Sequence, residues 1–119
     1  MTQTSAENCI FCQIIKRQTP TEIIYQDDLV TAFFDIQPIT PVHILIVPNQ
    51  HINSVDDASP EHEQALGRLF SVAQTTARQN SIHESGYRLV VNTGPQAGQT
   101  VYHLHMHLIG GRQMPFHSQ

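Results

Sequence analysis

The chain has 119 residues, of which 39% are apolar, and ten acidic against six basic side chains give a net charge of −4. This length predicts one domain with one modest core, and six scattered basic residues exclude a basic stripe that follows a polynucleotide backbone. No stretch approaches the roughly 20 apolar residues that span a bilayer, and the polar start MTQTSAEN is no secretion signal, so we expect a cytoplasmic protein with neither nucleic-acid nor membrane partners.

Apolar spacing and turn residues predict a short helix, three short strands, a long helix and two further strands. In chain order, these elements are a helix at 9–17, strands at 23–25, 29–34 and 42–47, a helix at 59–79, and strands at 87–92 and 101–109. The apolar stripe of the long helix consists of Leu66, Leu69, Phe70, Ala73 and Ala77. We expect residues 1–8 to form a disordered tail and residues 9–119 to form a single domain.

The connections between the predicted strands are short, which favours antiparallel pairing. Parallel pairing would need a crossover helix after each strand, and only one long helix lies between strands. The predicted fold is therefore α+β, a meander of about five antiparallel strands with the long and the short helix packed on it.

The most informative segment is the last predicted strand, VYHLHMHLI at 101–109. Side chains alternate between the two faces of a strand, so His103, His105 and His107 would share one face and apolar residues the other. Imidazole serves as a nucleophile, a proton carrier and a metal ligand near neutral pH. Imidazoles crowded on one face repel each other when charged, so we favour a functional site over a strand that merely contains histidines.

Other polar residues are expected near this strand. The loop TGPQAGQT at 93–100 contains glycines that admit backbone N–H groups to an anion, and the Thr100 hydroxyl is a further donor. His43 lies in an otherwise apolar strand, where a polar ring needs a partner. Asn92 either orients a substrate or caps a turn, and Asp35 either starts a turn or holds a pair of ribose hydroxyls.

Five motifs together carry a resemblance to a known family. They are DIQP at 35–38, PVHILIVP at 41–48, GQTVY at 98–102, HLHMHL at 103–108 and GGRQM at 110–114. These motifs resemble the histidine triad (HIT) family, and within it the nucleotide-binding branch of purine nucleoside phosphoramidases, over nearly the whole chain from about Cys9 to Met114. The resemblance implies a HIT-like fold, a homodimer whose sheets join into one, and hydrolysis of the P–N bond of nucleoside 5′-phosphoramidates.

The resemblance also implies a role for each matching residue. His105 would be the nucleophile that forms a nucleotidyl-histidine intermediate, which water converts to the nucleoside monophosphate. His107 would stabilise the phosphate, and His43 and His103 would support protonation of the site. The implied substrate contacts are Asn92, Gly98, Gln99 and Thr100 at the phosphate, Asp35 at the ribose, and Ile10, Phe11, Phe33 and Ile36 at the purine. No cofactor is expected to take part in catalysis.

The motif Cys9-Ile10-Phe11-Cys12 permits three interpretations: a metal site, two packed apolar thiols, or a redox pair. A structural disulfide is not expected in a cytosolic chain, and a redox pair is the weakest interpretation because no strand precedes the motif. Relatives with this N-terminal pattern bind zinc through two cysteines, a histidine matching His51 and the first triad histidine. The resemblance therefore implies a structural zinc site made of Cys9, Cys12, His51 and His103.

Several alternatives stay open at this stage. If all three triad histidines bound a metal, the chemistry would be that of metal-activated water. A non-catalytic purine nucleotide-binding module and a nucleotidyl transferase are further alternatives. Thr100 stands where relatives often have serine, and residues 115–119 belong to an end of the chain that influences the leaving group in relatives, so the expelled amine is not specified.

Overall fold

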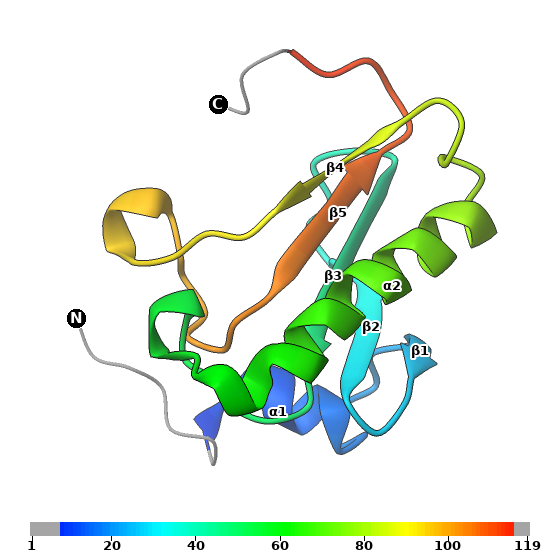
Figure 1. The fold of residues 1–119 in the computed structure, drawn as a ribbon. Helices are drawn as coiled ribbons and strands as arrows, with labels where there is room; N and C mark the ends of the chain where they lie inside the picture. Colours follow the sequence, from blue (N-terminus) through cyan, green and yellow to red (C-terminus); the bar gives the residue numbers. More distant parts are fainter. Residues whose placement is uncertain (1–7, 116–119) are drawn as a thin grey trace.

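The computed structural model describes residues 8–115, so the predicted tail at 1–8 lies outside the described residues apart from Asn8. Within this range the chain forms α1 (Ile10–Ile15), β1 (Ile23–Gln26), β2 (Val30–Phe34), β3 (Val42–Pro48), α2 (Glu63–Gln79), β4 (Tyr87–Val90) and β5 (Met106–Gly110), as Figure 1 shows. Three short 3-10 turns are η2 (Val55–Asp57), η3 (Pro60–His62) and η4 (Pro95–Ala97). The predicted α+β class is confirmed, and no helix of residues 8–115 is long and apolar enough to cross a membrane.

The five strands form one antiparallel sheet in the order β1-β2-β3-β5-β4. The antiparallel prediction is confirmed, but the simple meander is wrong because β5 lies between β3 and β4. The burial of β5 explains this position: Met106 and Leu108 are almost fully buried, whereas every residue of β4 is only half-buried. The more apolar strand lies inside the sheet and β4 forms its edge.

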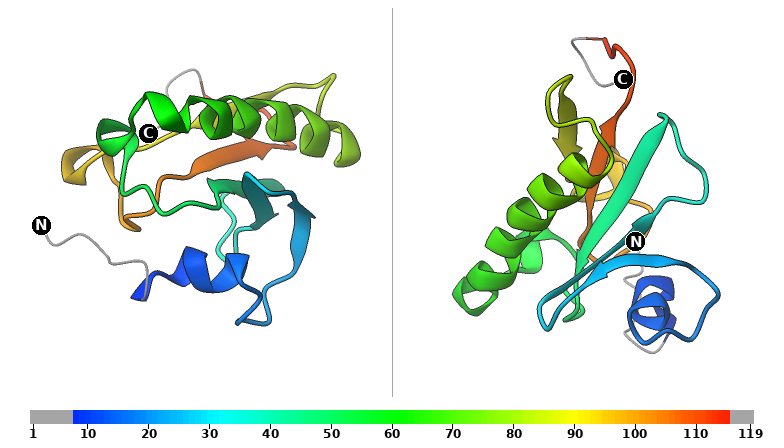
Figure 2. Two further views of the ribbon diagram at one scale, coloured as in Figure 1. Left: turned by 60° about the horizontal axis from the view of Figure 1, so that its bottom comes forward. Right: turned by 90° about the vertical axis from the view of Figure 1, so that its right-hand side faces the viewer.

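The two helices cover opposite faces of the sheet (Figure 2). The main core lies between α2 and the sheet, where Ile44, Ile46 and Leu108 are completely buried. A smaller cluster lies under α1 and includes Phe33 and Leu45. Because α1 is short, it covers only part of its face, and the remainder of that face is available for a site.

The buried face of α2 differs from the predicted stripe at one position. Leu69, Ala73 and Ala77 are buried as predicted, but the Phe70 side chain is 59% exposed. Val72 is buried instead. Successive helix residues are rotated by about 100°, so a face centred on Leu69 and Ala73 that includes Val72 on one side turns Phe70 outward on the other.

The last strand is shorter than predicted, because β5 begins at Met106 and residues 101–105 have no strand partner. Its neighbour β3 ends at Pro48, which has no N–H with which to continue the ladder. Leu104 is nevertheless buried in the main core, and its N–H donates to the Ile52 carbonyl at 2.7 Å. The irregular segment is therefore held in place by packing and this hydrogen bond.

Candidate active site

His43 and His107 lie on the neighbouring strands β3 and β5 and contact each other directly. The Nε2 atom of His43 is 2.9 Å from the Nδ1 atom of His107, and the backbone N–H of Ile39 donates to His43 Nδ1 at 3.2 Å. A backbone N–H can only donate, so neutral His43 carries its proton on Nε2 and donates it to His107. Neutral His107 must then carry its own proton on Nε2.

A second hydrogen bond sets the opposite tautomer in His105. The Nδ1 atom of His105 is 2.8 Å from the carbonyl oxygen of His103, and a carbonyl only accepts, so Nδ1 carries the proton. The Nε2 atom of neutral His105 is then an unprotonated lone pair. The rings of His105 and His107 are 5.0 Å apart between centroids. With these tautomers, Nε2 of His105 can attack as a nucleophile and Nε2–H of His107 can donate a hydrogen bond.

The surroundings keep these rings neutral. Burial lowers the pKa of His105 below its usual 6.5. Burial, together with the neighbouring His105 and His43, lowers the pKa of His107 to about 4. Burial also lowers the pKa of His43, opposed in part by Asp35, whose Oδ2 lies 3.4 Å from His43 Nε2. At neutral pH the site therefore presents uncharged imidazoles, the form in which histidine is a nucleophile.

A cavity of about 370 Å³ opens beside His105 and His107, between α1, the end of β2 and the chain that follows it. We call it the α1 cavity. Its apolar wall consists of Ile10, Phe11, Ile14, Phe33, Phe34 and Ile36. The ring of Phe11 lies edge-on to that of His105, with 5.1 Å between centroids. Asp35 and Thr100 supply polar groups at the same cavity. The cavity is therefore suited to a ligand in which an apolar ring system is joined to a polar group.

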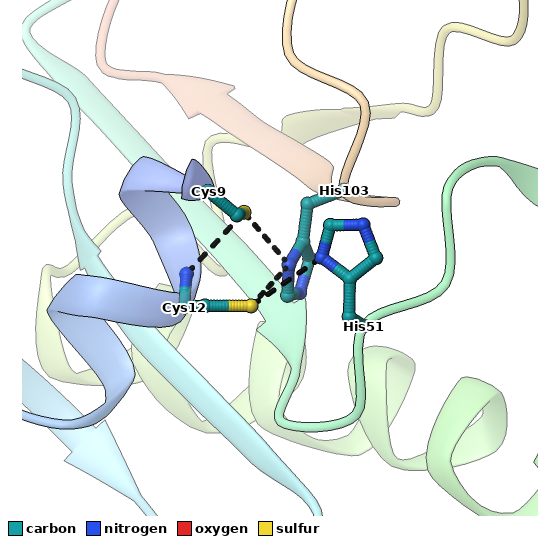
Figure 3. Close-up of side chains that lie close together, drawn as sticks. All are labelled: Cys9, Cys12, His51 and His103. Atoms are coloured by element: carbon teal, nitrogen blue, oxygen red, sulfur yellow. Dashed lines mark hydrogen bonds between the residues drawn. The ribbon is translucent and has the colours of Figure 1, made fainter. Parts of the chain in front are cut away.

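The cysteine motif forms a separate cluster with His51 and His103 (Figure 3). The Nδ1 atom of His103 lies 3.3 Å from Cys9 Sγ and 3.5 Å from Cys12 Sγ, and His51 Nδ1 lies 3.3 Å from Cys12 Sγ. The four ligand atoms lie within 4.8 Å of one another. Of the three sequence interpretations, this arrangement favours a metal site.

The hydrogen bonds around the cluster fit a zinc ion as well. His103 Nε2 donates to the Pro48 carbonyl at 2.8 Å, and His51 Nε2 lies 3.0 Å from Asn53 Oδ1. Both neutral rings thus turn an Nδ1 lone pair toward the sulfurs, as is typical of ligand histidines. Burial raises the pKa of the Cys12 thiol to about 11, and a divalent cation would favour the thiolate instead. Two cysteines and two histidines form a common structural zinc set.

Comparison with known proteins agrees with this geometry. A family model for the HIT domain matches residues 16–114. The chain belongs to the HIT family. This HIT chain is 59% identical over 109 residues to the purine nucleoside phosphoramidase of Escherichia coli (strain K12), with 92% of each chain covered. It is 47% identical over 107 residues to the 14 kDa zinc-binding protein of Brassica juncea, covering 88% of this chain and 94% of the relative.

A solved structure confirms the HIT fold. The HIT family hydrolase from Clostridium thermocellum matches with a TM-score of 0.89 and 48% identity, covering 92% of this chain and 95% of the other. The resemblance noted in the sequence is therefore confirmed for the family and the fold.

The HIT chain gathers most of the predicted site residues at the α1 cavity. These residues are Ile10, Phe11, Phe33, Asp35, Ile36, Thr100, His105 and His107. Phe34 was missed, because alternation places it on the opposite face from Phe33. It is the last residue of β2 and is 40% exposed. A strand end next to a predicted loop is the signal that identifies such a residue.

Three predicted residues shape the neighbouring loop instead. The Gln99 side chain is buried, donates to the carbonyls of Asn53 and Val101, and accepts from the Gly94 N–H. The Asn92 side chain donates to the Ala97 carbonyl. Gly98 has a φ of +84°, which favours glycine. The amide of Gln99 is therefore committed to the loop that carries Thr100 to the cavity.

His103 differs most from the sequence prediction. Its ring is completely buried among the cysteines and does not line the α1 cavity, so the rings of the three histidines do not face one common space. The irregular backbone before Met106 explains the difference, because regular strand alternation ends there. His103 acts on the site through its carbonyl oxygen, which holds His105.

Proposed function

We propose that this protein hydrolyses the P–N bond of purine nucleoside 5′-phosphoramidates. One observation carries the proposal: the ring of His105, whose Nε2 is unprotonated, lies 5.0 Å between centroids from the ring of His107, which carries its proton on Nε2, and both rings line a cavity with an apolar wall and the carboxylate of Asp35. The likeness to an E. coli protein named purine nucleoside phosphoramidase supports this choice of bond.

In the first step, Nε2 of His105 attacks the α-phosphorus while the P–N bond breaks. In the reactive form of the substrate, the nitrogen of the P–N bond is already protonated. The amine therefore departs as a neutral molecule that keeps this proton. The Nε2–H of His107 donates to a phosphoryl oxygen and stabilises its charge. The new nucleotidyl-histidine carries a positive ring, which its Nδ1–H stabilises by donating to the His103 carbonyl.

In the second step, water adds its oxygen to phosphorus and releases a proton to solvent, and the nucleoside monophosphate leaves with His105 restored. Covalent catalysis of this kind divides one difficult step into two easier ones. His43 takes part as a positioning residue, because its Nε2–H sets the tautomer of His107.

The residues that line the cavity support an assignment of each part of the substrate to a part of the site. The apolar wall takes the purine, Asp35 the ribose hydroxyls, and the loop from Asn92 to Thr100 the phosphate. The carboxylate of Asp35 is already oriented, since its Oδ1 accepts the N–H of Gln37 at 2.9 Å. We include Phe34 in the purine wall because it lines the same cavity.

We also propose that the Cys9 cluster binds a structural zinc ion, with Cys9, Cys12, His51 and His103 as ligands. When bound, zinc would hold α1 against the chain around His51 and His103, and the mechanism above routes no step through it. The zinc-binding relative from Brassica juncea supports this site.

We further propose a cytoplasmic homodimer. Cys9 and Cys12 do not form a disulfide with each other, as is typical of a reducing compartment. Strand β4 lies at an edge of the sheet, and an edge strand offers its outer N–H and C=O groups for pairing, so the same strand of a second copy fits there and joins the two sheets into one.

The test is a comparison of His105→Ala with the exposed-histidine control His83→Ala, using adenosine 5′-phosphoramidate. We expect His105→Ala to lose at least about 10³-fold in kcat while still binding AMP, and His83→Ala to match the wild type. Wild-type enzyme quenched with denaturant at alkaline pH, where a nucleotidyl-histidine is stable, should carry the nucleotidyl group on the peptide that contains His105. Retained turnover in His105→Ala contradicts the proposed nucleophile, and AMP binding without turnover of any phosphoramidate indicates a non-catalytic module.

A further inference from the structure

The side chain of Gln99 is an amide with an exposed fraction of 2% that follows an exposed turn. Its Nε2 donates to the carbonyl of Asn53 at 2.8 Å and to the carbonyl of Val101 at 3.2 Å. Its Oε1 accepts the Gly94 N–H at 2.9 Å. The amide has two N–H groups, and both are used inside the protein, so neither is available to a phosphate.

The loop that carries Gln99, residues 93–100, has an adaptable backbone. We call it the Gln99 loop. Gly94 and Gly98 have φ values of +87° and +84°, and glycine adopts several conformations at low cost. The hydrogen bonds that close its turn, from the N–H groups of Ala97 and Gly98, are 3.3 and 3.2 Å long, at the long end of the usual range. A buried amide that binds another segment therefore restrains the position of Thr100, which follows directly in the chain.

The segment that anchors Gln99 also holds the chain next to the proposed nucleophile. The Asn53 carbonyl accepts Gln99 Nε2. The preceding carbonyl, that of Ile52, accepts the Leu104 N–H at 2.7 Å, and Leu104 directly precedes His105 in the chain. Two consecutive carbonyls therefore fix the Gln99 loop and the nucleophile to one support.

We propose that Gln99 is a positioning residue, which holds the Gln99 loop in place relative to His105 so that Thr100 meets the phosphoryl group as it is attacked. This inference rests on the proposed function, in which this loop takes the phosphate. Gln99 itself does not touch the substrate. A displacement of about 1 Å in a group that positions a substrate can cost about 10²-fold in rate, so loss of this buried anchor should lower kcat.

The test compares Gln99→Met, an unbranched side chain of similar length that loses all three hydrogen bonds, with the control Thr76→Val. Thr76 is buried in α2, where its hydroxyl donates to the Val72 carbonyl at 2.9 Å, so the control also loses a buried hydrogen bond but lies outside the site. With adenosine 5′-phosphoramidate, we expect Gln99→Met to lose about 10–100-fold in kcat. Thr76→Val should stay within about twofold of the wild type.

Ligand binding separates a displaced loop from a damaged fold. Gln99→Met should bind adenosine within about twofold of the wild type, because the apolar wall of the α1 cavity is unchanged, and should bind AMP at least about fivefold more weakly. Equal weakening of adenosine and AMP binding, or a kcat within about twofold of the wild type, overturns the inference.

A double-mutant cycle with Thr100→Val separates positioning from direct contact. If Gln99 acts by placing Thr100, kcat of the double variant should be at least about threefold higher than additive losses predict. Additive losses indicate that Gln99 contacts the phosphate itself, which also overturns the inference. Gln99→Asn, whose amide is one methylene shorter, replaces Gln99→Met if that variant does not fold. Failure of the wild type to cleave the phosphoramidate overturns the proposed function instead, and the adenosine and AMP affinities then still test the anchor.

Discussion

The proton positions of His43 and His107 depend on one backbone amide, the N–H of Ile39, and His43→Leu tests this dependence. Leucine removes both the acceptor for the Ile39 N–H and the donor to His107 Nδ1. His107 can then carry its proton on either nitrogen, and in one of these forms a lone pair faces the phosphate. His43→Gln is the matched control, because its amide oxygen and nitrogen can replace the acceptor and the donor.

The expected loss of activity follows from the hydrogen-bond donor Nε2–H of His107, which His43→Leu no longer fixes. Removing one preorganised donor to a developing oxyanion costs about 10²–10³ in kcat. Because His107 still adopts the correct tautomer part of the time in His43→Leu, we expect a loss of about 10–100-fold in kcat/KM. His43→Gln should stay within about fivefold of the wild type. The hydrogen bonds lost in His43→Leu should also lower the free energy of unfolding by about 1 kcal/mol.

The assay combines hydrolysis of adenosine 5′-phosphoramidate with ¹⁵N NMR of the histidine rings. In the wild type and in His43→Gln, the His107 signals should show a protonated Nε2 and an unprotonated Nδ1. In His43→Leu they should show a mixture of both forms. A wild-type spectrum with the proton on Nδ1 of His107, or an activity of His43→Leu within about threefold of the wild type, would refute the tautomer chain.

Metal analysis should find about one zinc ion per chain in the wild type and none in the double variant Cys9→Ser/Cys12→Ser, which should also melt at a lower temperature; full zinc retention would contradict the site. Chelated protein that stays folded should keep its turnover, whereas a loss that zinc restores would indicate metal-activated water. The acid limb of kcat/KM should lie below pH 6.5, because the lowered pKa of His105 keeps its nucleophilic form present at more acidic pH than in an ordinary histidine; a limb above pH 6.5 would reverse this assignment. Leu69→Ala should cost about 2–5 kcal/mol in the free energy of unfolding measured with urea, and Phe70→Ala, at an exposed position, less than about 1 kcal/mol; equal losses would contradict the observed face of α2.

Local patterns were enough to predict most elements of the fold. The apolar run at 42–47 is β3, which ends one residue later at Pro48, and the long helix at 59–79 is η3 followed by α2. Strand order was not predictable in the same way, because the insertion of β5 between β3 and β4 depends on pairing between distant segments. The exposure of Phe70 likewise depends on which side of α2 meets the sheet.

Some residues of the candidate site were likewise predictable from local sequence patterns, and others were not. His105 and His107 were found from their spacing, and Asp35 and Phe33 reach the same cavity as expected. The position of the His103 ring was not predictable from alternation, because the strand starts only at Met106. Arg88 and Arg112 are 24 positions apart in the chain, and only the fold brings them to a second cavity that His107 also lines.

The first turn of α1 places neighbouring residues at two different sites. Cys9 and Cys12 lie against His51 and His103, while Ile10 and Phe11 line the α1 cavity. An extra residue inserted between the cysteines would rotate one of them by about 100° away from its partner and would displace the cavity wall in the same event. The length of this tetrapeptide is therefore constrained by both the cysteine cluster and the cavity wall, whereas a point substitution can alter one of them and preserve the other.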